Sequence, residues 1–130
     1  MIVLDASAVL ELLLDSPKGQ RVRARISAEA TLHAPHLLDL EVAQALRRYE
    51  RTGHIGPERA RGALQDLSEM PVERYPHNAL LPRIWALRRN ANAYEATYNA
   101  LAEALEAPLL TADARLGSVP GHAARVEVLK

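Results

Sequence analysis

Residues 94–116 read YEATYNALAEALEAPLLTADARL, and this stretch places two acidic residues where a helix and a strand meet. Ala, Leu and Glu dominate its first half, and apolar residues recur there at helical spacing, which predicts an amphipathic helix from about Tyr94 to Glu106. Pro108 ends that helix, and the short apolar run Leu-Leu-Thr at 109–111 is typical of a buried strand. The chain therefore reverses direction between the two elements.

Glu95 and Asp113 are the two acidic residues of this stretch. A helix of about a dozen residues runs roughly 18 Å, and a strand of about five residues returns roughly 16 Å. Both carboxylates are therefore expected at nearly the same height, at the carboxyl end of a strand. That edge is where open α/β sheets bind ligands.

Composition limits the class of protein. The chain has 130 residues, of which 48% are apolar, so we expect residues 1–130 to form one domain with a single core. The absence of Cys excludes disulfides, thiol catalysis and zinc–thiolate sites. Without a basic leader or a run of about 20 apolar residues, the sequence predicts a soluble, cytoplasmic protein. The formal net charge of zero argues neither for nor against a nucleic-acid partner.

The remaining segments alternate between strand and helix patterns. Strands are expected at 2–4, 32–34, 72–75, 109–111 and 125–129, and helices at 6–14, 17–30, 36–52, from 56 to just before Pro71, at 78–89, at 94–106 and briefly after Asp113. Leu64 is counted among the apolar positions of the fourth helix, and Leu81 and Trp85 among those of the fifth. This order predicts a parallel sheet with helices on both faces.

Two more acidic residues precede the opening stretch. Asp5 follows the apolar run 2–4 directly, although Asp5 or Ser7 could simply cap the helix that begins there. Glu41 lies beside the apolar face of helix 36–52, where an unpaired carboxylate is costly to bury. A structural partner such as an Arg is the alternative explanation for Glu41.

Asp5, Glu41, Glu95 and Asp113 each follow or face the carboxyl end of an expected strand, which suggests one acidic pocket. Four carboxylates at close range need a counter-charge, and an all-oxygen site suits Mg²⁺ or Mn²⁺. Such an ion can activate a water and bind a phosphodiester oxygen. Ser7 and Thr111 are candidates to orient these groups, although each could equally be a cap or a strand-end hydroxyl.

Four pieces of sequence, in this order, resemble the PIN-domain ribonucleases of the VapC toxin type. They are IVLDAS at 2–7, PHLLDLEVA at 35–43, AYEATYNALAE at 93–103 and LLTAD at 109–113. The resemblance spans nearly the whole chain. It implies a three-layer PIN-like α/β fold, in which a central, mostly parallel sheet of about five short strands is flanked by about seven helices.

The resemblance also implies a function. It implies an endoribonuclease toxin that depends on Mg²⁺ or Mn²⁺ and hydrolyses RNA with a metal-activated water. A VapB-type antitoxin would neutralise it, and the toxin would form a homodimer, or a heterotetramer or larger assembly with the antitoxin. Asp5, Glu41 and Asp113 match the family's acidic positions, whereas Glu95 stands where the family has Asp and Asn99 where it has an apolar residue.

Two other classes of function compete with this interpretation. The first is a PIN-like module that binds RNA or the antitoxin without turnover, because Glu95 is one methylene longer than Asp. The second is a phosphatase or receiver-like domain, which the lack of a second acid two residues after Asp5 argues against. For the nuclease, Arg88 and Arg89 are the candidate RNA-binding residues, since they precede the acidic helix, while the arginines at 47, 48 and 51 are interpreted as solvated.

Overall fold

The computed structural model describes residues 1–26 and 30–130. The elements, in chain order, are β1 (Ile2–Leu4), α1 (Ala6–Leu13), α2 (Pro17–Arg25), β2 (Leu32–Pro35), α3 (Leu37–Arg51), α4 (Pro57–Glu69), β3 (Val72–Tyr75), the 3-10 helix η1 (Asn78–Leu80), α5 (Leu81–Ala86), α6 (Ala93–Leu105), β4 (Leu109–Thr111), α7 (Ala114–Gly117) and β5 (Val126–Val128). The described strands form one sheet in the order β3-β2-β1-β4-β5, and all pairs are parallel. The expected fold class is confirmed.

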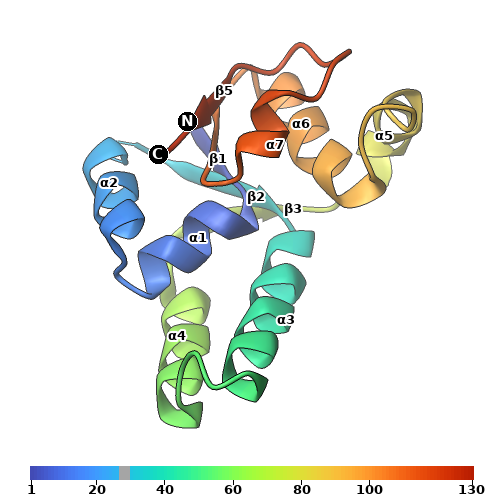
Figure 1. The fold of residues 1–130 in the computed structure, drawn as a ribbon. Helices are drawn as coiled ribbons and strands as arrows, with labels where there is room; N and C mark the ends of the chain where they lie inside the picture. Colours follow the sequence, from blue (N-terminus) through green and yellow to red (C-terminus); the bar gives the residue numbers. More distant parts are fainter. Residues whose placement is uncertain (27–29) are drawn as a thin grey trace.

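Apolar side chains on opposite faces of the sheet build two cores. Ile2, Leu4 and Leu110 point to the side that helices α1 to α4 cover. Val3 and Leu109 point to the other side, where α6 covers the sheet. Successive residues of a strand alternate between faces, so the apolar residues of β1 and β4 are buried between helical layers, together with Thr111 at the end of β4. Figure 1 shows these layers, with α3 and α4 extending side by side away from the sheet.

Order within the sheet fixes the position of the site. β1 pairs with β2 on one side and with β4 on the other, so the carboxyl ends of β1 and β4 are neighbours. The residues that follow these two strands are Asp5 and Ala112-Asp113. Because all strands are parallel, helices α1, α3 and α7 begin at this same edge of the sheet.

Several helix boundaries differ from the sequence expectations. The helix that begins at Pro17 ends at Arg25 rather than near Ala30, and the expected positions 27–29 lie outside the described residues. The segment expected as one helix over 78–89 consists of η1 and the short α5, with Pro82 in the first turn of α5. Pro lacks an N–H group, so a first-turn position is where it disturbs a helix least.

Three apolar residues that were counted on helix faces are exposed. Leu64 on α4 is 46% exposed, Leu81 on α5 is 52% exposed, and Trp85 on α5 is 67% exposed. Helical spacing groups apolar residues on a face but does not reveal whether another element covers that face. In the part of the chain that the structure describes, no helix combines the length and the apolar character that crossing a membrane requires.

Candidate metal-dependent nuclease site

Asp5 sits at the junction of β1 and α1 and is only 4% exposed. Its Oδ1 accepts hydrogen bonds from the backbone N–H of Ala8 (3.0 Å) and from Ser7 Oγ (2.8 Å). Its Oδ2 accepts one from Thr111 Oγ1 at 2.6 Å. Asp5 therefore caps α1, as the simpler interpretation expected, and is also fixed from β4. Burial raises the pKa of Asp5, while these hydrogen bonds oppose that shift.

Ser7 and Thr111 join the two ends of the site. Ser7 Oγ accepts the N–H of Ala112 at 2.9 Å, and Thr111 Oγ1 accepts the N–H of Asp113 at 2.9 Å. The two hydroxyl oxygens lie 3.1 Å apart, and each donates its single hydrogen to Asp5. The loop that carries Asp113 is thereby tied to the carboxylate of Asp5.

Glu41 on α3 has a tyrosine as its partner rather than an arginine. Tyr98 on α6 is 3% exposed, and its Oη donates to Glu41 Oε1 at 2.6 Å. Burial and the negative charge of Glu41 both raise the pKa of Tyr98, so the phenol stays neutral and remains a donor. The hydrogen bond links α3 to α6 across the cavity.

Glu95 lies in the first turn of α6 and exchanges two hydrogen bonds with the N-cap residue. Asn92 Oδ1 accepts the N–H of Glu95 at 2.9 Å, and Asn92 Nδ2 donates to Glu95 Oε1 at 3.1 Å. The first bond caps the helix, and the second joins two side chains rather than reaching the N-cap backbone N–H, as it would in a capping box. This second bond holds the longer glutamate side chain near the helix end.

Asp113 follows β4, caps α7 and is held by Arg115. Its Oδ1 accepts the N–H of Arg115 at 3.0 Å, and the guanidinium lies 2.8 Å from Oδ2 through Nη2. The Nε of Arg115 contacts both carboxylate oxygens, at 3.1 and 3.2 Å. The hydrogen bond from the Arg115 side chain lowers the pKa of Asp113, so this carboxylate is ionised at neutral pH.

All four acidic residues line one cavity of about 670 Å³. Its wall comes from α1, α3, the start of α6 and the β4–α7 junction, and it also includes Tyr98, Gln44, Arg48 and Arg115. The sequence predicted that these acids gather, and the structure brings them to one cavity. Each carboxylate has its own non-acidic partner. Among the described residues, no three Asp, Glu or His side chains lie close enough together to form a metal site.

The donor set nevertheless fits a hard divalent cation. It consists of carboxylate oxygens that face a shared, open cavity, and Mg²⁺ commonly uses one or two carboxylates and keeps several waters. The negative charge of Asp113 adds to burial in raising the pKa of Asp5. A cation between these groups would relieve that electrostatic cost.

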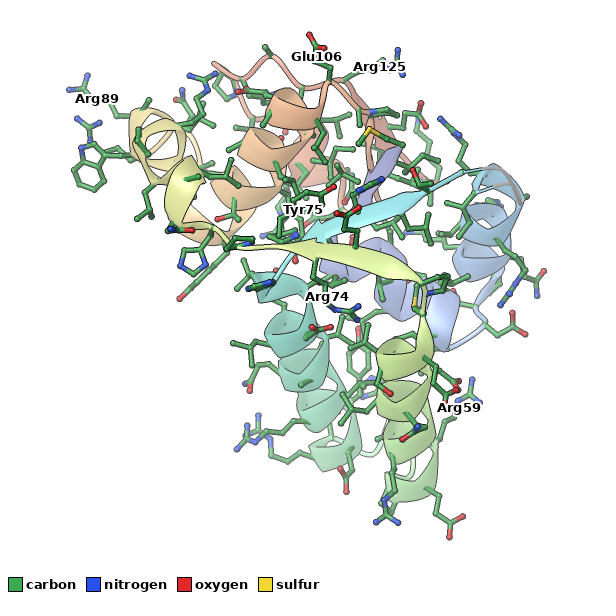
Figure 2. All side chains as sticks on the ribbon, turned by 180° about the vertical axis from the view of Figure 1, so that it is seen from behind. Arg59, Arg74, Tyr75, Arg89, Glu106 and Arg125 are labelled. Carbon is green, nitrogen blue, oxygen red and sulfur yellow. The ribbon has the colours of Figure 1, made fainter. Side chains whose placement is uncertain are left out.

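Four of the residues singled out in the sequence lie outside the cavity wall, namely Thr111, Asn99, Arg88 and Arg89. Asn99 on α6 is fully buried, and its Nδ2 contacts the backbone oxygen of Glu95 at 3.4 Å. Its Oδ1 has no hydrogen-bond partner among the described residues. Arg88 and Arg89 follow α5, where the Arg88 guanidinium stacks on Trp85 at 4.6 Å. Figure 2 shows Arg89 at the outer end of α5, directed away from the body of the molecule.

The structure also adds residues that the sequence reasoning did not place in the site. Arg48 lies two helical turns after Glu41 on α3, and Arg115 lies two residues after Asp113. Both line the cavity, and Arg48 is also exposed, which agrees with its interpretation as solvated. The seven-residue spacing from Glu41 to Arg48, which puts both on one face of a helix, was the available signal.

Comparisons with known proteins agree with this architecture. The PIN domain family model matches residues 2–121. The chain belongs to the PIN domain family. It is 47% identical over 116 residues to the VapC ribonuclease Mb0985 of Mycobacterium bovis, covering 89% of this chain and 88% of that protein. It is 41% identical over 129 residues to the ribonuclease VapC1 of Mycobacterium tuberculosis, covering 98% and 97%.

A solved structure has the same fold as this PIN domain. It is VapBC2 from Rickettsia felis bound to a DNA fragment from the promoter, with a TM-score of 0.73 and full coverage of both chains. Its sequence identity is 14%, so this likeness concerns the fold alone.

Proposed function

We propose that this PIN domain is an endoribonuclease toxin of a type II toxin–antitoxin system, dependent on Mg²⁺ or Mn²⁺ and acting in the cytoplasm. The observation that carries the proposal is the single cavity that Asp5, Glu41, Glu95 and Asp113 share. The likeness to VapC ribonucleases supports RNA as the substrate.

These four residues would hold the divalent cation. When bound, the cation would neutralise the carboxylates, polarise a phosphodiester oxygen and lower the pKa of a bound water. The chain itself supplies the orientation. Ser7, Thr111 and the N–H of Ala8 fix Asp5.

The other polar groups of the cavity have separate tasks. Tyr98 orients Glu41 through its 2.6 Å hydrogen bond. Arg48 and Arg115 supply positive charge on the same wall, where they can contact the RNA backbone. These groups support cleavage of a backbone bond, which requires no recognition of a particular base.

A VapB-type antitoxin is the proposed protein partner, because solved structures with this fold include VapBC2 from Rickettsia felis and a toxin–antitoxin complex from Klebsiella pneumoniae. A homodimer, or a heterotetramer or larger assembly with antitoxin, completes the proposal. Leu40 at 73% exposed and Leu81 at 52% exposed leave apolar surface on α3 and α5 for such contacts.

The test is cleavage of a mixed structured-RNA pool by the purified, antitoxin-free protein in Mg²⁺ or Mn²⁺, with and without EDTA. We expect discrete cuts that EDTA and Asp5→Ala abolish. Asp66→Asn is the control, because Asp66 is an exposed carboxylate on α4 outside the cavity. If the native chain cleaves no RNA in Mg²⁺ and none in Mn²⁺, the proposal is wrong.

A further inference from the structure

Arg115 covers the carboxylate that a cation would need. Its guanidinium contacts both oxygens of Asp113, with Nη2–Oδ2 at 2.8 Å and Nε–Oδ1 at 3.1 Å. A cation at Asp113 would use the same lone pairs and would lie next to a second positive charge. Both cannot occupy that carboxylate in this geometry.

Asp113 differs in this respect from the other acids of the cavity. Among the described residues, Asp5 is held by hydroxyls and a backbone N–H, Glu41 by the Tyr98 phenol and Glu95 by the Asn92 amide. These partners are neutral, so none of them cancels the charge of the carboxylate that it contacts. Asp113 alone of the four is in an ion pair in this part of the chain.

The Arg115–Asp113 pair is built so that one partner can leave. The Arg115 side chain is 81% exposed, whereas that of Asp113 is 28% exposed. Exposed ion pairs are weak because water solvates the separated charges. The backbone stays in place, since the Arg115 N–H is bonded to Asp113 Oδ1 at 3.0 Å in the cap of α7. A released guanidinium therefore remains at the cavity wall.

The released guanidinium has a suitable second partner in RNA. Guanidinium groups bind phosphate oxygens through two parallel hydrogen bonds, as they bind carboxylates. We propose that Arg115 exchanges partners, pairing with Asp113 in the metal-free protein and with an RNA phosphate once a divalent cation is held at Asp113. The inference rests on the proposed function, because it assumes that the cavity takes both a cation and RNA.

The exchange couples the two ligands. Removing the Arg115 charge frees Asp113, so cation binding in the absence of RNA should become tighter. It also removes a phosphate contact that forms only when the cation is present. Linkage requires that the cation and RNA strengthen each other's binding by the same factor, and part of that factor would be lost with Arg115.

The experiment measures Mn²⁺ affinity by calorimetry with Mn²⁺ alone. It also measures the affinity of a fluorescent single-stranded RNA with and without Mn²⁺, by stopped-flow anisotropy read before cleavage proceeds. For Arg115→Gln we expect Mn²⁺ binding tighter by about two- to five-fold, the range for an exposed ion pair. We also expect the Mn²⁺-dependent gain in RNA affinity to shrink by a similar factor. Arg115→Lys keeps the charge but lacks the planar guanidinium group. Its Mn²⁺ affinity and its Mn²⁺-dependent gain in RNA affinity should therefore lie between those of the native chain and those of Arg115→Gln.

Two comparison variants separate partner exchange from simple loss of charge. Arg25→Gln breaks an equivalent pair with Glu127 outside the cavity and should match the native chain. Arg48→Gln removes a charge from the same cavity wall without touching Asp113. It should weaken RNA binding equally with and without Mn²⁺.

The results distinguish failure of this inference from failure of the proposed function. If Arg115→Gln cleaves RNA with Mn²⁺ but keeps the native coupling, or binds Mn²⁺ no more tightly, partner exchange is wrong and the nuclease stands. If the native chain neither binds Mn²⁺ nor cleaves RNA, the proposed function itself is wrong. Thermal unfolding of each variant checks that the fold is intact.

Discussion

Tyr98 Oη donates a hydrogen bond of 2.6 Å to Glu41 Oε1, and the two partners lie 57 positions apart in the sequence. Replacing Tyr98 by Phe removes the donor and keeps the ring that packs on β1 and β4. We expect cleavage to fall by about ten-fold or more, because loss of a group that orients a ligand commonly has that effect. The free energy of unfolding should fall by only about 1 kcal/mol, since Glu41 can be solvated from the cavity.

Tyr75→Phe is the matched control for Tyr98→Phe. It removes a phenol that contacts His33 Nδ1 at 2.7 Å, on β3 and away from the cavity. Both variants lose one hydrogen bond, so a comparable change in the unfolding free energy is expected. Only Tyr98→Phe should slow cleavage, and equal cleavage rates would show that the Glu41 contact has no part in the reaction.

Asp5 should make the protein less stable as pH rises. Burial raises the folded-state pKa of Asp5, so between its unfolded and folded pKa values the folded protein binds more protons than the unfolded chain. Stability from this group is therefore lost as pH rises from about 4, the unfolded value. In metal-free buffer, the unfolding free energy of Asp5→Asn relative to the native chain should increase across this window and then level off.

Asp113→Asn provides a comparison of opposite sign. Arg115 lowers the pKa of Asp113, so the stability that this pair contributes is present above the unfolded pKa and is lost as pH falls through the folded pKa. Denaturant unfolding at a series of pH values measures both variants. Parallel pH trends for the two would contradict the electrostatic assignments, while both variants should lose cleavage at neutral pH.

The backbone framework of the site was largely readable from sequence. Strand-to-helix junctions at Asp5 and Asp113 follow from short apolar runs that end in a capping residue, and a parallel sheet places such junctions at one edge. The reversal after Pro108 brings Glu95 to the same cavity. Local patterns determine these features, so no long-range information was needed.

Ser7 and Thr111 contact Asp5 as the sequence suggested, but the partners of Glu41 and Asp113 were not predictable in the same way. Glu41 was paired with an Arg in the alternative interpretation, but Tyr98 reaches it from α6, which packs on β1, β2 and β4. Likewise Arg88 and Arg89 are close to Glu95 in sequence, yet Arg48 and Arg115 line the cavity. Side-chain contacts between distant segments depend on how the elements pack, and helical spacing does not predict that packing. The same limitation explains the exposed Trp85.

Arg88 and Arg89 remain predicted RNA-binding residues, and salt dependence tests them. Neither is in an ion pair within the described part of the chain, and Arg88 stacks on the exposed Trp85. If both contact phosphates, the double variant Arg88→Gln and Arg89→Gln should reduce the steepness of the salt dependence. The slope of log affinity against log salt concentration should become less negative by about 1.4 for single-stranded RNA.

The control for these two arginines is a double Gln variant at Arg21 and Arg61, which are exposed on α2 and α4. It removes the same total charge from other surfaces. If its salt slope changes as much as that of the Arg88 and Arg89 variant, long-range charge explains the effect, and the assigned phosphate contacts are wrong.

Glu95 decides between a working nuclease and a module that only binds. Glu95→Gln keeps the oxygen that accepts from Asn92 Nδ2 at 3.1 Å, so the cap of α6 and the unfolding midpoint should be retained. Cleavage should nevertheless fall at least ten-fold, because one charge of the acidic set is lost. Glu95→Asp keeps the charge but withdraws it by one methylene, and it should cleave at a rate comparable to that of the native chain. Cleavage by Glu95→Asp together with inactivity of the native chain would instead establish the binding module, with glutamate at this position as its cause.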